Sequence, residues 1–415
     1  MNIINVRLSA MMFMQFFIWG GWFVTLGTFM SNNLAATGAD LSMAYSTQSW
    51  GAIIAPFFVG LIADRFFNAE RVLAVLHIIG ALLMFAMYQS SDVSEFYPYV
   101  LGYMIVFMPT LALVNSVSFA QLSNPSAQFG KIRVWGTVGW IVAGLVISYV
   151  FSWDSQANIE SGFLANTFLM CSAVSLLLGI YCFTLPSTPP TGRGKKVAMR
   201  DILGLDALSL LKQRNFFVFF VSSVLICIPL AFYYQNANPF LTEIGVENAT
   251  GKMTIGQMSE VLFMLALPIF LNRFGIKITL LIGMFAWALR YAFFAYGNAD
   301  EGMFLLLIGI ALHGICYDFF FVSGQIYTDQ KAGKDVKSAA QGLITLATYG
   351  VGMLIGFWLA GKVTDSYAME AGHNWTDIWL FPAVFAAVVM ILFAVLFKSE
   401  KVAATETNTS GDKHA

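Results

Sequence analysis

Residues Met303 to Gln325 read MFLLLIGIALHGICYDFFFVSGQ, an apolar stretch of about the length that crosses a bilayer as one helix. Asp318 lies deep within it, with His313 and Tyr317 close by. A carboxylate at such a depth costs several kcal/mol unless it faces a wet cavity or a partner. Because a membrane helix has no need of this group, the stretch predicts both a spanning helix and a candidate functional site.

The composition of the whole chain supports this membrane assignment. Of the 415 residues, 58% are hydrophobic and 11% are charged, and the mean hydropathy is +0.72. These values lie outside the range of soluble domains, so we expect an all-α polytopic membrane protein. A net charge of -1 and the absence of a long basic block in the sequence exclude nucleic acid as a partner. The cysteines lie apart in apolar runs, so no metal site or cofactor is expected.

Hydropathy predicts twelve membrane-spanning helices. Each segment contains about 20 mostly apolar residues, as a bilayer requires. The predicted spans are 8–31, 42–63, 72–90, 97–119, 129–151, 163–184, 215–241, 253–271, 277–296, 302–325, 338–361 and 376–397.

The longest polar connection lies between the sixth and seventh spans, and it predicts the domain organisation. We expect an N-terminal six-helix bundle over residues 1–185, a cytoplasmic linker over 186–214, a C-terminal six-helix bundle over 215–398 and a disordered cytoplasmic tail over 399–415. With the N-terminus inside, nearly all loop cations face the cytoplasm, whereas Lys252 and Lys362 face outward. This asymmetry predicts that both termini are cytoplasmic.

The two halves of the sequence resemble each other. Pro56 in the second span corresponds to Pro268 in the eighth, and the fifth and eleventh spans are both rich in glycine. Ordinary helix packing explains any single glycine equally well. The matched positions favour the repeat architecture of a transporter whose halves rock against each other.

Three residues of the fifth span form the first group of candidate binding residues. Arg133, Thr137 and Trp140 follow one another at one-turn intervals on one face of the predicted helix. Arg133 could alternatively extend to the membrane interface. A cation, a hydroxyl and an aromatic ring on one face suit an aromatic, hydroxylated solute.

The seventh and eighth spans supply further candidates. Gln257 and Glu260 share one face of the eighth span, and an amide beside a carboxylate can bind sugar hydroxyls or the edge of a base. The seventh span ends in a polar and aromatic run that includes Tyr234, Gln235 and Asn236, which Pro239 is expected to unwind in part. An interfacial aromatic belt is the alternative interpretation of this run.

Four ionisable residues within the spans are expected to balance one another's charges. They are two cations and two acids: Arg133, Arg290, Glu260 and Asp318. We expect Arg133 and Glu260 to form a pair, either acid to carry a proton, and Arg290 to be structural. His313 is either a binding residue or a polar group satisfied between helices.

Several longer segments together resemble the nucleoside:H+ symporter family of the major facilitator superfamily. They are QFFIWGGWFVTLGTFM, LVNSVSFAQL, RVWGTVGW, ILGLDALSLLK, QMSEVLFMLALPIFLNRFGIK and YDFFFVSG. The resemblance implies twelve helices in two six-helix bundles, and a proton-coupled symporter that imports nucleosides by alternating access across the bacterial cytoplasmic (inner) membrane. It also implies a binding site that includes Arg133, Thr137, Trp140, Gln257, Glu260 and Asp318, with Glu260 and Asp318 as the proton-coupling acids.

The chain departs from that family's pattern at some site positions. Ala231 and Tyr234 stand where well-known members have a glutamine and an asparagine, His313 replaces a tyrosine and Tyr317 a phenylalanine. Gln235, Asn236 or His313 could supply the missing contacts.

Other functions also fit the sequence. The chain could transport another polar solute such as a sugar or nucleobase, or sense a solute in the membrane. An enzyme is not expected, since the sequence shows no metal cluster, nucleophile–base pair or phosphate loop. We expect a monomer in the lipid bilayer, with a nucleoside and a proton as its partners.

Overall fold

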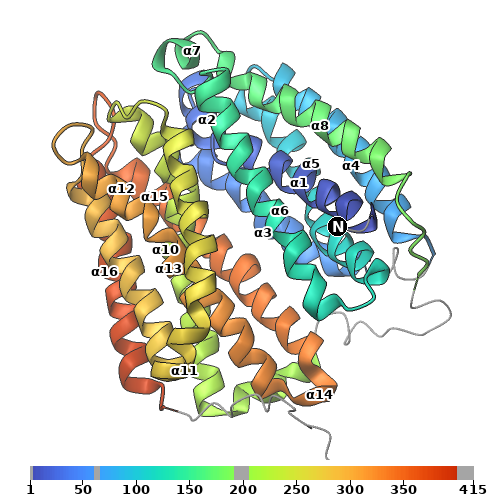
Figure 1. Ribbon diagram of the computed structural model, residues 1–415. Helices are drawn as coiled ribbons and strands as arrows, with labels where there is room; N and C mark the ends of the chain where they lie inside the picture. The colour runs from blue at the N-terminus through green and yellow to red at the C-terminus, as the bar shows by residue number, and fades with distance from the viewer. Residues whose placement is uncertain (1–2, 60–65, 191–204, 400–415) are drawn as a thin grey trace, which may run out of the picture.

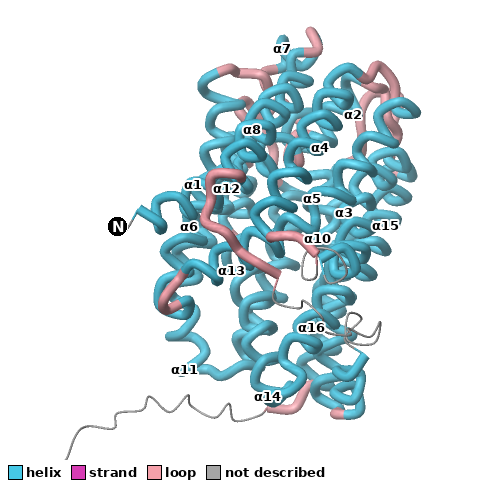
Figure 2. The backbone as a smooth tube through the Cα atoms, turned by 90° about the vertical axis from the view of Figure 1, so that its right-hand side faces the viewer, coloured by secondary structure: helices cyan, strands magenta, loops and turns pink. Residues whose placement is uncertain are grey.

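The computed structural model describes residues 3–59, 66–190 and 205–399, which are almost entirely helical (Figures 1 and 2). The N-terminal part contains α1 (Ile3–Trp22), α2 (Leu26–Asn33), α3 (Gly38–Phe58), α4 (Ala69–Gln89), α5 (Val93–Gln121), α6 (Pro125–Leu145), η2 (Val146–Val150), α7 (Gln156–Glu160), η3 (Phe163–Ala165) and α8 (Asn166–Cys182). The C-terminal part contains η4 (Leu205–Lys212), α10 (Arg214–Glu243), α11 (Ala249–Tyr296), α12 (Met303–Ala311), α13 (His313–Tyr317), η5 (Asp318–Val322), α14 (Ser323–Thr345), η6 (Leu346–Gly352), α15 (Met353–Ser366) and α16 (Trp375–Leu396).

These helices form two bundles. Helices α1 to α8 pack mainly on one another, with α1 against α6 and α4 against α5 and α8, and helices α10 to α16 pack in the same way around α11. Contacts of α3 with α15 and of α6 with α11 join the two bundles, which lie side by side in Figure 1. The predicted all-α fold of two helix bundles is therefore confirmed.

Each predicted span has a helical counterpart. Ten described helices are long and apolar enough to cross a membrane. One of them, α11, is two helices joined at Gly275, whose φ of 72° breaks the helical path. Helix α3, at the second predicted span, is not among these ten. It is less apolar because it contains Ser42, Ser46, Thr47, Gln48 and Ser49. The predicted tail and much of the predicted linker fall on residues outside the described ranges.

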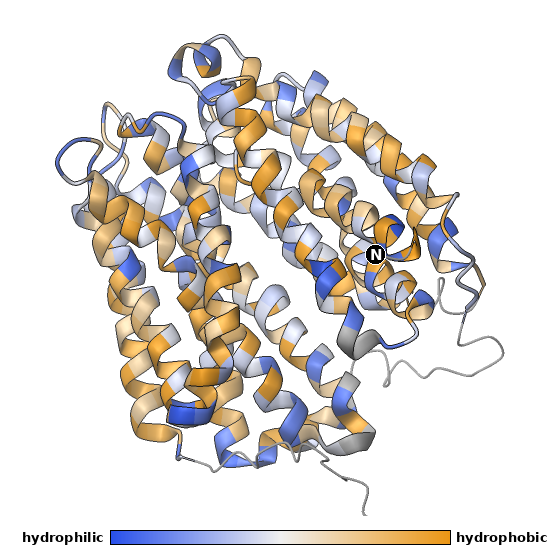
Figure 3. Ribbon diagram, in the orientation of Figure 1, coloured by the Kyte–Doolittle hydropathy of each residue, from blue (hydrophilic) through white to orange (hydrophobic). Residues whose placement is uncertain are grey.

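The outer faces of the bundles are apolar (Figure 3). Leu265 is 75% exposed and Val395 is 74% exposed, and many other large aliphatic side chains are similarly open. A soluble protein rarely exposes contiguous apolar surface on this scale. These faces are suited to contact with lipid tails.

Buried polar side chains inside the N-terminal bundle satisfy one another. Gln15 donates to Thr110 Oγ1 at 2.7 Å and contacts His77 Nε2 through its carbonyl oxygen at 2.7 Å. His77 Nδ1 lies 3.3 Å from Ser175 Oγ. Since buried polar groups are costly without partners, this network fixes α1, α4, α5 and α8 relative to one another.

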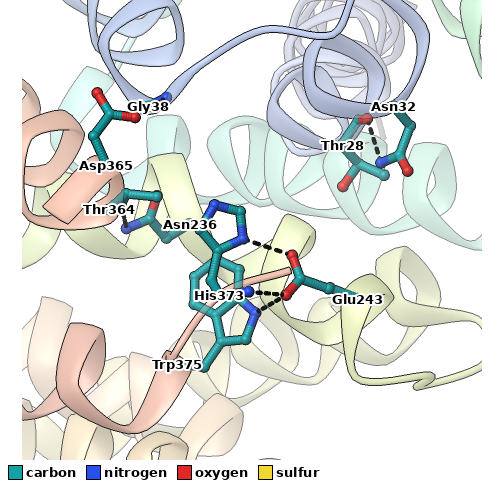
Figure 4. Close-up of polar contacts among 9 residues, drawn as sticks. All are labelled: Thr28, Asn32, Gly38, Asn236, Glu243, Thr364, Asp365, His373 and Trp375. Carbon is teal, nitrogen blue, oxygen red and sulfur yellow. Dashed lines mark hydrogen bonds and ion pairs between the residues drawn. The ribbon is translucent and has the colours of Figure 1, made fainter. Parts of the chain in front are cut away.

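The bundles are joined by polar contacts at one end, which is at the top of Figure 1. Asp365, at the end of α15, lies beside Gly38 in Figure 4 and accepts a hydrogen bond from the Gly38 backbone N–H at 2.7 Å. It also accepts from the backbone N–H of Ala39 at 2.9 Å. These N–H groups belong to the first turn of α3, whose positive dipole end favours a carboxylate. We call this end of the molecule the joined end.

A second contact of this kind at the joined end has its carboxylate in the N-terminal bundle and its capped helix in the C-terminal bundle. Asp154, between η2 and α7, accepts from the Thr250 N–H in the first turn of α11 at 3.0 Å and from the Ser148 hydroxyl at 2.5 Å. Ser148 Oγ in turn accepts from the Gly251 N–H at 2.7 Å. Each bundle therefore contributes a carboxylate that caps a helix of the other bundle.

Pro239 does not unwind the end of α10. The helix continues through this residue to Glu243. The prediction of a partly unwound run was therefore wrong. The proline ring packs closely against Gly27 of α2 instead: a Cβ atom added at Gly27 would lie only 2.7 Å from Pro239 Cγ. Glu243 then accepts from the His373 N–H at 2.7 Å and from the Trp375 indole N–H at 2.9 Å, which holds the loop before α16 (Figure 4).

Candidate functional site

A central cavity lies between the two bundles. It encloses about 650 Å³, counting the space that is open to solvent. Predicted residues that line it are Arg133, Thr137, Trp140, Tyr234, Gln257, Glu260, His313 and Tyr317, and they are joined by Phe16, Trp19, Phe23 and Tyr349. The lining is mostly aromatic with a few polar groups, as is typical of small-molecule sites.

The wall from the N-terminal bundle is formed by α6 and α1. Gly136 and Gly139 allow close approach of these helices, since a Cβ atom at either glycine would meet α1. The Arg133 guanidinium carbon lies 4.1 Å from the centre of the Phe16 ring. Trp140 meets Trp19 edge-on with the ring centres 5.5 Å apart. The predicted face of cation, hydroxyl and aromatic ring is therefore present, and α1 adds aromatic side chains to it.

The wall from the C-terminal bundle comes from α10, α11, α13 and η6. Gln257 and Glu260 of α11 face the cavity together. Tyr317 and Tyr349 share a hydrogen bond between their hydroxyl groups at 2.8 Å. Tyr234 meets Phe23 of the opposite bundle with ring centres 5.7 Å apart. Aromatic contact thus crosses the cavity, and the acid and the amide remain open to a ligand.

The expected ion pair between Arg133 and Glu260 is not formed in this structure. Both residues line the cavity from opposite bundles. However, their charged atoms do not approach within the 4.0 Å of a salt bridge, and the guanidinium lies on Phe16 instead. In this conformation the two groups are separate, because each belongs to a different wall of an open cavity.

Three predicted site residues lie away from the cavity lining. Asp318 is fully buried at the start of η5, and neither of its oxygens has a hydrogen-bond partner among the described residues. Gln235 is also fully buried with an unpartnered side chain. Asn236 donates to Thr364 Oγ1 at 3.0 Å (Figure 4) and lines a separate cavity at the joined end.

The π-helical turn η5 changes the geometry around Asp318. Residues Asp318–Val322 depart from the regular α-helix between α13 and α14. Such turns occur frequently at functional sites. Burial of an unpaired ionised carboxylate costs several kcal/mol. Asp318 is therefore stable at this position only as a neutral acid, or in another conformation in which a group pairs with its charge.

The geometry fits the result of comparison with known families. The family model described as "Nucleoside H+ symporter" matches residues 1–402. The chain belongs to this family. The nucleoside H+ symporters are transporters, so the chain is a transporter and not an enzyme.

Individual relatives cover nearly the whole chain. YegT of Escherichia coli (strain K12) is 45% identical over 402 residues, which are 95% of this chain and 94% of YegT. The xanthosine permease of the same organism is 36% identical over 410 residues, covering 95% of this chain and 96% of the permease. The nucleoside permease NupG, also from this organism, is 32% identical over 417 residues, covering 97% of each chain.

A solved structure is similar along the same length. The crystal structure of a NupG mutant superposes with a TM-score of 0.89 at 31% identity, over 95% of this chain and 100% of that chain. The likeness to the nucleoside transporter NupG therefore extends from the sequence to the arrangement of the helices.

Proposed function

We propose that this nucleoside H+ symporter imports nucleosides together with protons by alternating access, and that the central cavity is its binding site. The observation that carries the proposal is the cavity lining: aromatic rings from both bundles surround Arg133, Thr137, Gln257 and Glu260. A nucleoside needs both a planar apolar surface for its base and polar groups for its hydroxyls. The names under which the relatives YegT, xanthosine permease and NupG are known all state a nucleoside, in agreement with this ligand class.

The base stacks on Trp140 in this proposal. The indole is half-buried, is held edge-on against Trp19, and lines both the central cavity and its narrow extension toward the joined end. Thr137 and Arg133 lie one and two turns away and supply donors to the same ligand. Gln257 and Glu260 accept from the ribose hydroxyls on the opposite wall.

Proton coupling is assigned to Glu260 and Asp318. Glu260 lines the cavity, where it can exchange a proton with solvent and contact the substrate. Asp318 is buried, and no described residue bonds to its oxygens, as suits an acid that is neutral in this conformation. When the walls of the cavity approach each other, Arg133 can pair with Glu260 and displace its proton.

Alternating access then consists of rocking the bundles about the cavity. The carboxylate caps of Asp365 and Asp154 close the joined end in this structure, and their release would open it. In the proposed orientation, the joined end faces outward and both chain termini are cytoplasmic. We further propose that the protein acts as a monomer in the bacterial inner membrane.

Uptake into proteoliposomes tests the function and the location of the site. Vesicles that contain the purified chain should take up radiolabelled uridine and adenosine but not a hexose. Arg133→Gln should lower nucleoside uptake at least tenfold, since it removes the cation of the cavity. Arg71→Gln, which changes an exposed arginine outside the cavity, is the matched control and should behave as the parent. Hexose uptake without nucleoside uptake contradicts the proposal.

A further inference from the structure

Arg290 is a fully buried arginine behind the cavity wall. One terminal nitrogen lies 2.9 Å from His313 Nδ1, and the guanidinium carbon lies 3.5 Å from the centre of the Tyr233 ring. The ion pairs found among the described residues do not include Arg290, and its Nε and other terminal nitrogen have no acceptor there. Burial of a guanidinium costs several kcal/mol, and contact with ring faces offsets only part of this. Packing alone therefore does not account for an arginine at this position.

The contact with Arg290 determines where His313 carries its proton. A guanidinium has only N–H donors and no acceptor. His313 Nδ1 must therefore be the acceptor in this hydrogen bond, with its lone pair directed at the arginine. A neutral imidazole that accepts at Nδ1 carries its hydrogen on Nε2. As long as the contact persists, His313 is a neutral Nε2–H donor.

The orientation of the His313 ring is also fixed. The ring stacks on Tyr233 with centres 5.4 Å apart and an angle of 27° between the planes. A Cβ atom at Gly256 would lie 3.1 Å from His313 Cβ, which shows how closely α11 approaches α13. The Gly314 N–H donates to Ser259 Oγ at 3.1 Å across the same contact. With this packing, the hydrogen bond from Arg290 to Nδ1 favours one of the two ring orientations.

The Nε2 side of the ring is left to the cavity. His313 is one of the cavity-lining residues, and Nε2 has no hydrogen-bond partner among the described residues. The neighbouring hydroxyls of Tyr317 and Tyr349 are bonded to each other. This wall thus presents to a ligand an N–H donor of fixed direction, beside the carboxylate of Glu260.

We propose that Arg290 is a positioning residue that holds His313 as an Nε2–H donor, and that His313 thereby selects nucleosides with an oxo group at C4 of a pyrimidine or C6 of a purine; this rests on the function proposed above. An oxo oxygen accepts from Nε2–H. An exocyclic amino group at the same place brings a donor against a donor and leaves both unsatisfied in a desolvated site. The ligand class is a nucleoside whose base has an oxo group at C4 (pyrimidine) or C6 (purine), such as uridine or inosine, in preference to cytidine or adenosine, which have an amino group there.

Binding of two matched pairs of ligands tests the selection. Dissociation constants of the full-length protein are measured for uridine and cytidine, and for inosine and adenosine. The parent should bind the oxo member of each pair at least tenfold more tightly, and His313→Phe should bring both ratios within about twofold of one. Equal affinities in the parent, or a preference that survives His313→Phe, overturns the inference while leaving nucleoside transport intact. A parent that binds no nucleoside contradicts the proposed function itself.

Variants of Arg290 test its role through His313. Arg290→Met should lower the ratios to those of His313→Phe, and the double variant should show no further change. Arg290→Lys should keep the preference, because an ammonium group also only donates to Nδ1. Arg273→Met changes an arginine on the same helix that lies away from the cavity lining, and should behave as the parent. If Arg290→Met weakens all four ligands alike, its role is merely structural and the inference fails.

The tautomer can be observed directly. The chain has four histidines, so nitrogen-15 labelling of histidine followed by solid-state NMR in bilayers gives few signals, and His313→Phe assigns the one of interest. The parent should show hydrogen on Nε2 and none on Nδ1 of His313, and Arg290→Met should lose this restriction. A parent signal with hydrogen on Nδ1 overturns the inference, whatever the binding data show.

Discussion

The caps at the joined end should control how often the bundles separate there. In the parent, the two carboxylate oxygens of Asp365 accept from the Gly38 and Ala39 N–H groups. Asp365→Asn keeps one of these acceptors but removes the other acceptor and the negative charge. A carboxylate at a helix N-terminus contributes about 0.3–1 kcal/mol when exposed, as Asp365 is. We therefore expect the joined arrangement of the bundles to lose up to about 1 kcal/mol of stability. This is roughly a fivefold shift in the equilibrium between joined and separated bundles.

Asp154→Asn should have a larger effect. This carboxylate is only 5% exposed, and it accepts from both the Thr250 N–H and the Ser148 hydroxyl. Hydrogen bonds to a charged group at a buried site contribute about 1.5–3 kcal/mol. A loss of about 2 kcal/mol corresponds to roughly a thirtyfold shift toward the separated state.

Distance measurements between the bundles provide the assay. Spin labels on cysteines introduced at the exposed positions Glu160 and Glu370 report on separation at the joined end, and the native cysteines are buried. Asp40→Asn is the matched control: Asp40 caps the same helix but bonds to Thr37 within its own bundle. The caps do not control separation if both cap variants retain the parent's distance distribution, or if Asp40→Asn shifts it as much.

Three further predictions concern the cavity and the closing contact. Trp140→Ala should weaken uridine binding about tenfold or more and Trp140→Phe less, since base stacking contributes about 1–3 kcal/mol; equal, small losses in calorimetry indicate a packing role. Glu260→Gln should still exchange nucleoside across vesicle membranes but lose accumulation driven by a pH gradient; if it accumulates like the parent while Asp318→Asn cannot, the coupling role belongs to Asp318. Gly361→Leu should block closure at the joined end and lower uptake, because a Cβ atom there would lie 2.6 Å from the Gly38 carbonyl oxygen; normal uptake by a folded variant contradicts this.

The sequence alone predicted much of the cavity because helical periodicity places residues on faces. Arg133, Thr137 and Trp140 share a face of α6, and Gln257 and Glu260 share a face of α11, so each group lines the cavity. The aromatic residues of α1 were missed. Their spacing within QFFIWGGWF was a usable signal, since Phe16, Trp19 and Phe23 recur at helical intervals.

Adjacent residues were the main limit of prediction. Tyr317 and Asp318 are neighbours in sequence, yet only Tyr317 lines the cavity, because successive residues on a helix point about 100° apart. The same holds for Tyr234 and Gln235 on the uninterrupted helix α10. A hydrophobic pattern indicates which segment crosses the membrane but does not give its rotation about its own axis.

The contact of Arg290 with His313 could not have been predicted either. The two residues are 23 positions apart, and their hydrogen bond depends on how α11 and α13 pack. The sequence indicated only that a cation lies within a span, and the expected structural role is refined by the contact to His313.

The central claim is that a proton gradient drives nucleosides through this protein, and one measurement tests it most directly. Proteoliposomes with an inward proton gradient are given radiolabelled uridine, with sodium or choline as the bulk cation. We expect uridine to accumulate above its external concentration, equally in sodium and in choline, and a protonophore to abolish the accumulation. Accumulation that requires sodium and persists with the protonophore would contradict the account.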